Sequence, residues 1–276
     1  MIGIAIDKGF IKSVDQRILD FFPEYGNVNS RNLLGDLTLK HLLTMKAGFL
    51  TREGRRTGLA PMLNRLKKQK DWVKFILSLP IIKTKINTFQ YNSAVSHLLS
   101  AILLKSTKLD SERFANQFLY KPLGIEEFPA SNEESYKLED IISNNKIHVW
   151  LKDPQGINIG GWGITMKVRD LAKFGLLYLN FGKWGKNQII SSKWIRDSIK
   201  NYIKDSSLEH GMGYGYQWWI RKIDRYFTFN ALGSGGQVIS CVPKLDLVVV
   251  ITSNASKARW KDPLYLIGKY VIPAIQ

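Results

Sequence analysis

The sequence predicts an α+β protein, with helices over most of the chain and an antiparallel sheet near its end. Apolar residues before position 205 recur every three to four positions in several segments, which is the helical period. After Gly213 the pattern changes to short runs rich in aromatic and β-branched residues, which is typical of strands. The last apolar segment, residues 263–274, is a predicted closing helix. Helices followed by neighbouring strands indicate α+β rather than a βαβ sheet.

Several predicted helices begin after residues that commonly cap helices. Thr38 and Asp71 are such caps, and Gly48 and Pro80 are stop signals. The first helical segment has no cap before Ile2 and therefore resembles the last two turns of a helix. The expected helices are residues 2–9, 39–47, 72–79, 93–105, 111–119, 168–179 and 192–200.

The expected strands are residues 216–221, 225–229, 237–242 and 247–252. Turns at 233–236, which are rich in glycine, and at 243–246 separate them, so the strands should form a tight antiparallel meander. We expect a single domain over residues 1–276, with a mainly helical region at 1–205 and the sheet with its closing helix at 206–276.

The composition narrows the classes of partner that the chain could bind. The 276 residues carry 40 Lys+Arg against 23 Asp+Glu, a net charge of +17, and 45% are hydrophobic. This charge favours anionic surroundings, of which a cell-wall polymer is one, but the basic clusters at 52–56 and 65–70 are short and match no nucleic-acid-binding signature. A solvated basic surface is the preferred interpretation, without specific nucleic-acid binding. No apolar run is long enough for a transmembrane segment, and Met1 to Gly9 is no signal peptide, so the chain as written would be cytoplasmic.

Five groups of motifs occur in one order along the chain. They are LTLKHLLTMKAG at 37–48, FQYNS at 89–93 with HLLS at 97–100, GGWG at 160–163 with RDLAKFG at 169–175, GYGYQWW at 213–219, and GSGGQ at 233–237. Together they resemble the β-lactamase-related serine hydrolases, a group that includes class C β-lactamases, penicillin-binding DD-peptidases, esterases and amide hydrolases. The resemblance implies a β-lactamase/transpeptidase-like fold, in which an antiparallel sheet flanked by helices lies beside a helical region.

The same resemblance implies acyl transfer through a serine ester, which needs an activated hydroxyl, a base and oxyanion donors. Tyr91 matches the family's proton-relay tyrosine. A phenol has an ordinary pKa of about 10, and a nearby ammonium would lower it. Ser93 stands where many relatives carry Asn, and the main-chain N–H of Ser234 matches the oxyanion donor. The alternative for Tyr91 is a buried aromatic at a helix start.

Four further residues are expected to line the substrate site by resemblance. They are Gly233, Gly235, Trp162 and Asp153. The strand motif, usually Lys or His followed by Thr or Ser and Gly, reads Ala231-Leu232-Gly233 here. Its missing cation and hydroxyl favour ester or amide substrates, small molecules or peptides, over β-lactams. The alternatives are a plain hairpin turn at 233–236 and a shaped loop at 153–156.

The nucleophile motif of the family is the part of the match that we do not find in this sequence. The family's Ser-x-x-Lys opens a helix that should lie two to three turns before Met1, and the first strands of the fold should precede it. We therefore expect a truncated chain, with Leu247 to Thr252 as an exposed sheet edge and reduced stability. The match at Ser143-Asn144-Asn145-Lys146 is out of order, and we interpret it as chance.

No other chemistry is predicted. The four histidines show no metal-binding spacing, and no cofactor or metal is implied. The single cysteine, Cys241, is expected to be a small buried hydrophobe. Three functions stay open: a serine hydrolase, a non-catalytic remnant that binds peptides or cell-wall fragments, and a basic nucleic-acid-binding protein.

Overall fold

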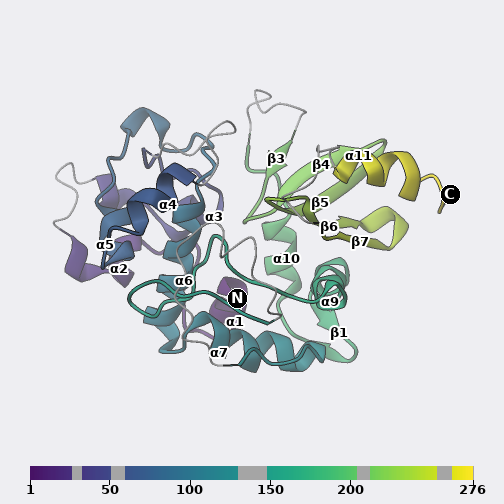
Figure 1. The fold of residues 1–276 in the computed structure, drawn as a ribbon, viewed down its shortest axis with the longest axis horizontal. Helices are drawn as coiled ribbons and strands as arrows, with labels where there is room; N and C mark the ends of the chain where they lie inside the picture. The colour runs from purple at the N-terminus through teal and green to yellow at the C-terminus, as the bar shows by residue number, and fades with distance from the viewer. Residues whose placement is uncertain (27–32, 51–59, 130–147, 204–211, 254–262, 276) are drawn as a thin grey trace. The chain divides into compact units, whose positions relative to one another are not determined.

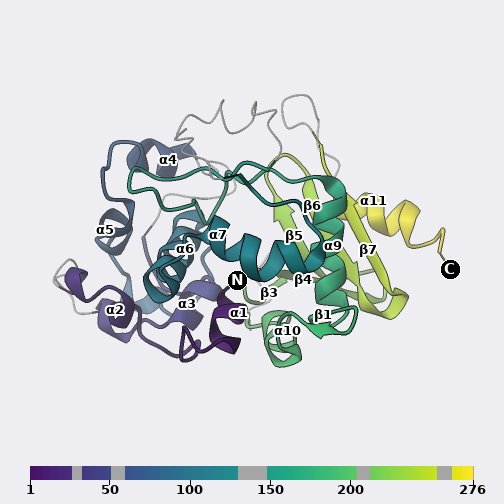
Figure 2. The same cartoon turned by 90° about the horizontal axis from the view of Figure 1, so that it is seen from below.

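The computed structural model describes residues 1–26, 33–50, 60–129, 148–203, 212–253 and 263–275. Contacts divide the chain into two compact units, Met1–Thr165 and Met166–Gln276 (Figures 1 and 2). No helix in the described ranges has the length and apolar character needed to cross a membrane.

The first unit is helical and is built around α6 (Ser93–Thr107). Every residue of α6 from Ser93 to Leu103 is buried, because other helices of the unit, among them α3 and α5, pack around it. The elements in order are α1 (Ile2–Asp7), α2 (Ile18–Phe21), η1 (Pro23–Tyr25), η2 (Leu33–Asp36), α3 (Leu39–Leu43), α4 (Ala60–Leu66), α5 (Trp72–Leu77), η3 (Lys83–Lys85), α6, α7 (Ser111–Ala115), η4 (Asn116–Tyr120) and η5 (Lys121–Leu123).

The predicted helix caps of this unit are confirmed. The Asp71 Oδ1 accepts the main-chain N–H of Lys74 at 2.8 Å and so begins α5. Thr38 and His41 form a reciprocal capping box at the start of α3. α3 ends at Leu43, earlier than predicted, because Met45 takes a left-handed conformation with φ 56°.

The second unit contains a five-stranded antiparallel sheet in the order β3-β4-β5-β6-β7. The strands are β3 (Gly213–Tyr214), β4 (Trp219–Ile223), β5 (Tyr226–Gly233), β6 (Gln237–Val242) and β7 (Leu247–Ile251). Sequence order equals spatial order, so the predicted meander is confirmed. In the described chain β7 lies at the sheet edge, as expected, and each of its residues is partly buried.

Helices cover both faces of this sheet (Figure 2). α9 (Val168–Leu179) packs on one face, where a Cβ at Gly175 would lie 2.7 Å from a Val248 methyl. On the other face, α11 (Pro263–Leu266) and η8 (Ile267–Val271) form a buried cluster with side chains of β5 and β6. The hairpin β1 (Lys183–Trp184) and β2 (Asn187–Gln188), the helix α10 (Ser192–Ser198) and the turn η7 (Pro243–Leu245) complete the unit.

The two compact units divide after Thr165, inside the stretch 1–205 that the sequence predicts to be mainly helical. The helices α9 and α10 lie in that stretch and belong to the second unit. The reason is packing, since α9 buries its apolar face on β6 and β7 rather than on other helices. Periodicity shows that a helix has an apolar face but does not show what covers that face.

Candidate functional site

Tyr91 lies at the head of α6. It is 38% exposed, whereas Asn92 and Ser93, which follow it, are buried. The Asn92 Oδ1 accepts the main-chain N–H groups of Ala94 at 3.0 Å and Val95 at 3.3 Å, which caps the helix. Because this cap fixes where α6 begins, it also fixes the point from which Tyr91 leaves the helix.

A glycine pair packs main chain against main chain on the first turns of α6. A Cβ built on Gly161 would lie 2.3 Å from the carbonyl oxygen of Ser93, and one built on Gly160 would lie 2.1 Å from that of Ser96. No Cβ can come so close to a main-chain oxygen without displacing it. Glycine at both positions therefore lets the loop rest directly on the helix.

Trp162 follows this pair and is half-buried. Its ring lies 5.9 Å from the ring of Trp72, the first residue of α5, at an interplanar angle of 37°. Its Nε1 is buried and has no hydrogen-bond partner among the described residues. Two of the predicted site residues, Ser93 and Trp162, are thus brought together through Gly161.

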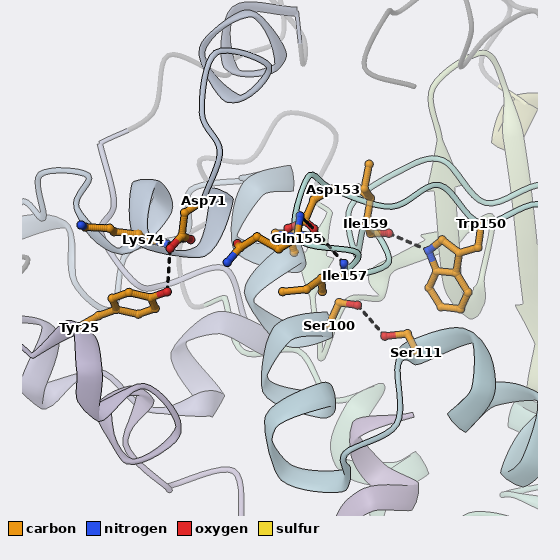
Figure 3. Close-up of polar contacts among 11 residues, drawn as sticks. Tyr25, Asp71, Lys74, Ser100, Ser111, Trp150, Asp153, Gln155, Ile157 and Ile159 are labelled. Atoms are coloured by element: carbon orange, nitrogen blue, oxygen red, sulfur yellow. Dashed lines mark hydrogen bonds and ion pairs between the residues drawn. The ribbon is translucent and has the colours of Figure 1, made fainter. Parts of the chain in front are cut away.

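Asp153, which we expected to line the substrate site or to shape a loop, lies in the interior. Its carboxylate is fully buried. Oδ1 accepts the main-chain N–H groups of Gln155 and Ile157, each at 2.8 Å (Figure 3). Oδ2 lies 3.0 Å from the His97 Nε2. The carboxylate is turned inward because it closes the turn at Gly156, which has φ 77°.

The phenol of Tyr25 lies in the neighbourhood of this loop. Its hydroxyl donates to the Asp71 Oδ2 at 2.8 Å (Figure 3). Burial raises the pKa of Tyr25 to about 12, and the hydrogen bond to Asp71 adds to this effect, while a hydrogen bond with the Gln155 side chain opposes it. Asp71 therefore serves both the start of α5 and the link to η1.

His97 is the residue of this unit whose role the sequence analysis missed. Only one of its ring nitrogens, Nε2, has a hydrogen-bond partner in the described part of the chain. One signal was present, since His97 follows Ser93 by four residues and so lies on the same face of a helix. Its partner Asp153 is 56 residues further along the chain, and no pattern announces that contact.

The remaining predicted residues lie in the second unit. Gly233 ends β5 and pairs with Gln237, the first residue of β6. Ser234 is exposed in the turn that follows, whereas Gly235 is buried. Gly235 and Gly236 have φ of 86° and 81°, so this turn requires glycine at both positions.

Two side chains hold that turn in place. The Gln237 Nε2 donates to the Ser253 carbonyl at 2.6 Å, and the Gln237 Oε1 accepts the Ser253 N–H at 3.3 Å. The Ser253 hydroxyl donates to the carbonyl of Gly235. The main-chain N–H of Ser234 therefore lies in a braced turn at the end of two long strands.

Other sequence expectations fall elsewhere. The Ser143–Lys146 match, His210 and the basic cluster at 52–56 lie outside the described residues. Within the described ranges, no three His, Cys, Asp or Glu side chains come together in a way that could hold a metal ion.

The family model for β-lactamase matches residues 12–270 of this chain. The 6-aminohexanoate-dimer hydrolase of Paenarthrobacter ureafaciens is 25% identical over 118 residues, which are 40% of this chain and 29% of that protein. The β-lactamase-like protein 4 of Dictyostelium discoideum is 23% identical over 250 residues, 82% of this chain and 41% of that protein. The chain thus spans less than half the length of either relative.

Solved structures agree with the fold. A family VIII carboxylesterase superimposes with a TM-score of 0.65 and 17% identity, covering 100% of this chain and 79% of that one. The match of the family model over nearly the whole chain decides the family. With the capped tyrosine helix, the glycine pair and the glycine turn in place, the chain belongs to the β-lactamase family, the serine hydrolases that its motifs predicted.

Proposed function

We propose that this chain provides the tyrosine and the oxyanion turn of a serine hydrolase that cleaves an ester or amide bond through an acyl-enzyme. The observation that carries the proposal is the exposure of Tyr91 at the head of a helix whose next residues are buried. A rigid helix start holds the phenol in one place, as a proton relay requires. We propose that Ser93 orients the substrate and that the main-chain N–H of Ser234 is the oxyanion donor.

The Ala231-Leu232-Gly233 strand supports ester or amide substrates. Ala231 and Leu232 of β5, which pair with Ile239 and Val238 of β6, offer no cationic or hydroxyl side chain to a β-lactam carboxylate. A 6-aminohexanoate dimer and a carboxylic ester, the substrates printed in the names of similar proteins, fit that class. We assign Asp153 a supporting role rather than a substrate contact, because its carboxylate is buried.

The attacking hydroxyl is the missing component. The 276 residues hold one Ser-x-x-Lys, at Ser143, and it is out of the family's order. We therefore propose that the 276-residue chain by itself is inactive. Its alternative function is that of a non-catalytic protein that binds peptide or cell-wall fragments.

A fluorophosphonate probe tests both parts of the proposal. The 276-residue chain should stay unlabelled, and labelling at any serine would overturn its inactivity. The coding DNA before the Met1 codon should be read for an in-frame Ser-x-x-Lys. A chain that includes such a segment should be labelled, and Tyr91→Phe should slow labelling by about 10²–10⁴-fold.

Tyr25→Phe is the matched control, since it removes a phenol of the same unit that binds Asp71 instead of substrate. Equal labelling of Tyr91→Phe and the parent chain would remove Tyr91 from the mechanism. If no such upstream segment exists, binding of a peptide or muropeptide that shifts the Tyr91 NMR signals would favour the alternative function.

A further inference from the structure

Two ionisable side chains are buried together behind the head of α6. The side chains of His97 and Asp153 are both 0% exposed, and their Nε2 and Oδ2 atoms lie 3.0 Å apart. Removing such groups from water is unfavourable unless their polar atoms find partners. Asp153 meets this condition fully, since Oδ1 takes two main-chain N–H groups and Oδ2 takes His97.

His97 finds a hydrogen-bond partner at only one of its two ring nitrogens in the described part of the chain. Its Nδ1 is buried and has no hydrogen-bond partner among the described residues. An imidazolium would bury an N–H group there without an acceptor, which is costly. A neutral ring with its proton on Nε2 avoids this cost, because Nε2–H donates to the carboxylate and Nδ1 keeps only a lone pair.

We propose that His97 and Asp153 are positioning residues for Tyr91 and Ser93, an inference that rests on the proposed function. His97 donates from Nε2 to Asp153, and Asp153 closes the turn at Gly156. That turn fixes the position of the loop that rests on Ser93. Neither residue is catalytic, since both are fully buried and cannot meet a substrate.

The loop is stiff enough to carry this effect from Asp153 to Gly161. Two bridges, Lys152 with Asn158 and Trp150 with Ile164, pair its two sides. The Trp150 Nε1 also donates to the carbonyl of Ile159 at 2.9 Å (Figure 3). A shift at Asp153 therefore moves the glycine pair rather than being absorbed by a slack segment.

The helix α6 connects the two places at which the loop is held. His97 and Ser93 are one turn apart on α6, so the loop is held to the same helix at two places: by Asp153 on His97 and by Gly161 on Ser93. The ring of Trp72 contacts both His97, at 5.5 Å, and Trp162, at 5.9 Å, between ring centroids. The two anchors therefore act as one clamp.

A Ser-His-Asp relay is the alternative use of such a pair. A relay needs the second ring nitrogen on a serine hydroxyl. The Nδ1 of His97 has no such partner in the described part of the chain, and it is out of reach of solvent. The geometry supports a clamp and not a relay.

The tautomer is the first test, and it uses the 276-residue chain without any activity. Two-dimensional ¹⁵N–¹H NMR of the histidine rings, with the His97 signals assigned by their loss in His97→Gln, should show a neutral ring protonated at Nε2. A ring protonated at Nδ1, or a charged ring, would overturn the proposed hydrogen bond.

Amide exchange is the second test. His97→Leu should speed exchange at Gln155 and Ile157 by about tenfold or more, because their carboxylate acceptor loses its anchor. His97→Gln keeps a side-chain N–H near the Nε2 position and should stay close to the parent. Ser100→Ala is the control, since Ser100 is buried one turn along α6 and bonds Ser111 at 2.6 Å instead of the loop.

Ser100→Ala should leave the amide exchange rates of Gln155 and Ile157 unchanged relative to those of the rest of α6. If all three variants speed exchange equally along the unit, His97 supports the whole unit and the positioning role is wrong. The positioning role is also wrong if His97→Leu leaves the exchange rates of the loop amides unchanged.

The acylation assay separates this inference from the proposed function. In a form that the probe labels, His97→Leu should slow acylation by about 10²-fold, and His97→Gln should restore most of the rate. Equal rates for parent and His97→Leu would overturn the positioning role while leaving the hydrolase proposal intact. If no form is labelled, the hydrolase proposal fails, and the tautomer and exchange results still decide whether the clamp exists.

Discussion

The side-chain amide of Gln237 meets the main chain of Ser253 twice, donating from Nε2 at 2.6 Å and accepting at Oε1 at 3.3 Å. Such a two-point contact reproduces one rung of a strand ladder with a side chain. It extends the pairing of β6 and β7 past Ile251, where β7 ends. The Ser234 turn is therefore anchored from the side of the neighbouring strand.

Replacing this amide by a carboxylate should loosen the turn. In Gln237→Glu the donor is lost and an oxygen faces the Ser253 carbonyl, so the free energy of unfolding should fall by about 1–3 kcal/mol. Gln188→Glu is a matched control, since the Gln188 Nε2 also donates to main-chain carbonyls, those of Phe181 and Ile190. Urea unfolding should show similar losses, but hydrogen exchange at 234–236 should rise only in Gln237→Glu. A rise in both variants would contradict the local brace.

Adding one methyl group at Gly161 should destabilise the first unit. The new Cβ would lie 2.3 Å from the Ser93 carbonyl oxygen, and relieving that overlap should cost about 1–3 kcal/mol. Gly26→Ala is the control, because its nearest atom would be an ordinary 3.5 Å away, and its effect should stay within about 0.5 kcal/mol. The measurement is the midpoint of urea unfolding, and equal midpoints for the two variants would refute the close approach.

The phenol of Tyr25 should ionise only at strongly alkaline pH. Its pKa is raised to about 12 by burial and by the Asp71 hydrogen bond and charge, all of which favour the neutral phenol. A raised pKa means that this stabilisation is complete below the unfolded value of about 10 and is lost as pH rises from there to about 12. Absorbance titration at alkaline pH, taken as the difference from Tyr25→Phe, gives the value. Asp71→Asn should move it downward, and an unchanged value would show that Asp71 has no influence.

The thiol of Cys241 should be almost unreactive in the folded protein. Burial raises its pKa to about 12, and its Sγ lies 3.5 Å from the Gly175 carbonyl beneath α9. Because the thiolate is the reactive form, a disulfide reagent at pH 8 should modify Cys241 slowly in buffer and rapidly in urea. The protein should also lose stability as pH rises from about 9 towards 12, since only the unfolded chain then ionises freely. Fast modification of the native protein would contradict the buried position.

Local pattern was enough to predict most elements. The apolar periodicity of α9 and the run of β-branched residues in β6 gave the bounds that the structure has. Irregular places were missed. The segment 111–119 divides into α7 and a wider turn, η4, and β4 begins three residues later than expected.

The candidate site was less predictable than the fold. Tyr91 and the glycine turn could be found because short motifs mark them. The contact between His97 and Asp153 joins two separate segments, and its chemistry depends on burial, which a sequence shows only indirectly. The inward direction of Asp153 follows from main-chain hydrogen bonds two and four residues away, which composition does not reveal.

The contact between the glycine pair and α6 has an evolutionary consequence. The loop rests on the carbonyl oxygens of Ser93 and Ser96, groups that every amino acid possesses. Selection can therefore exchange the buried side chain at 93 for another small one without disturbing how the loop is seated, so long as 160 and 161 remain glycine. Invariance should concentrate on the loop side of this contact, while the helix side is left open for adaptation to new substrates.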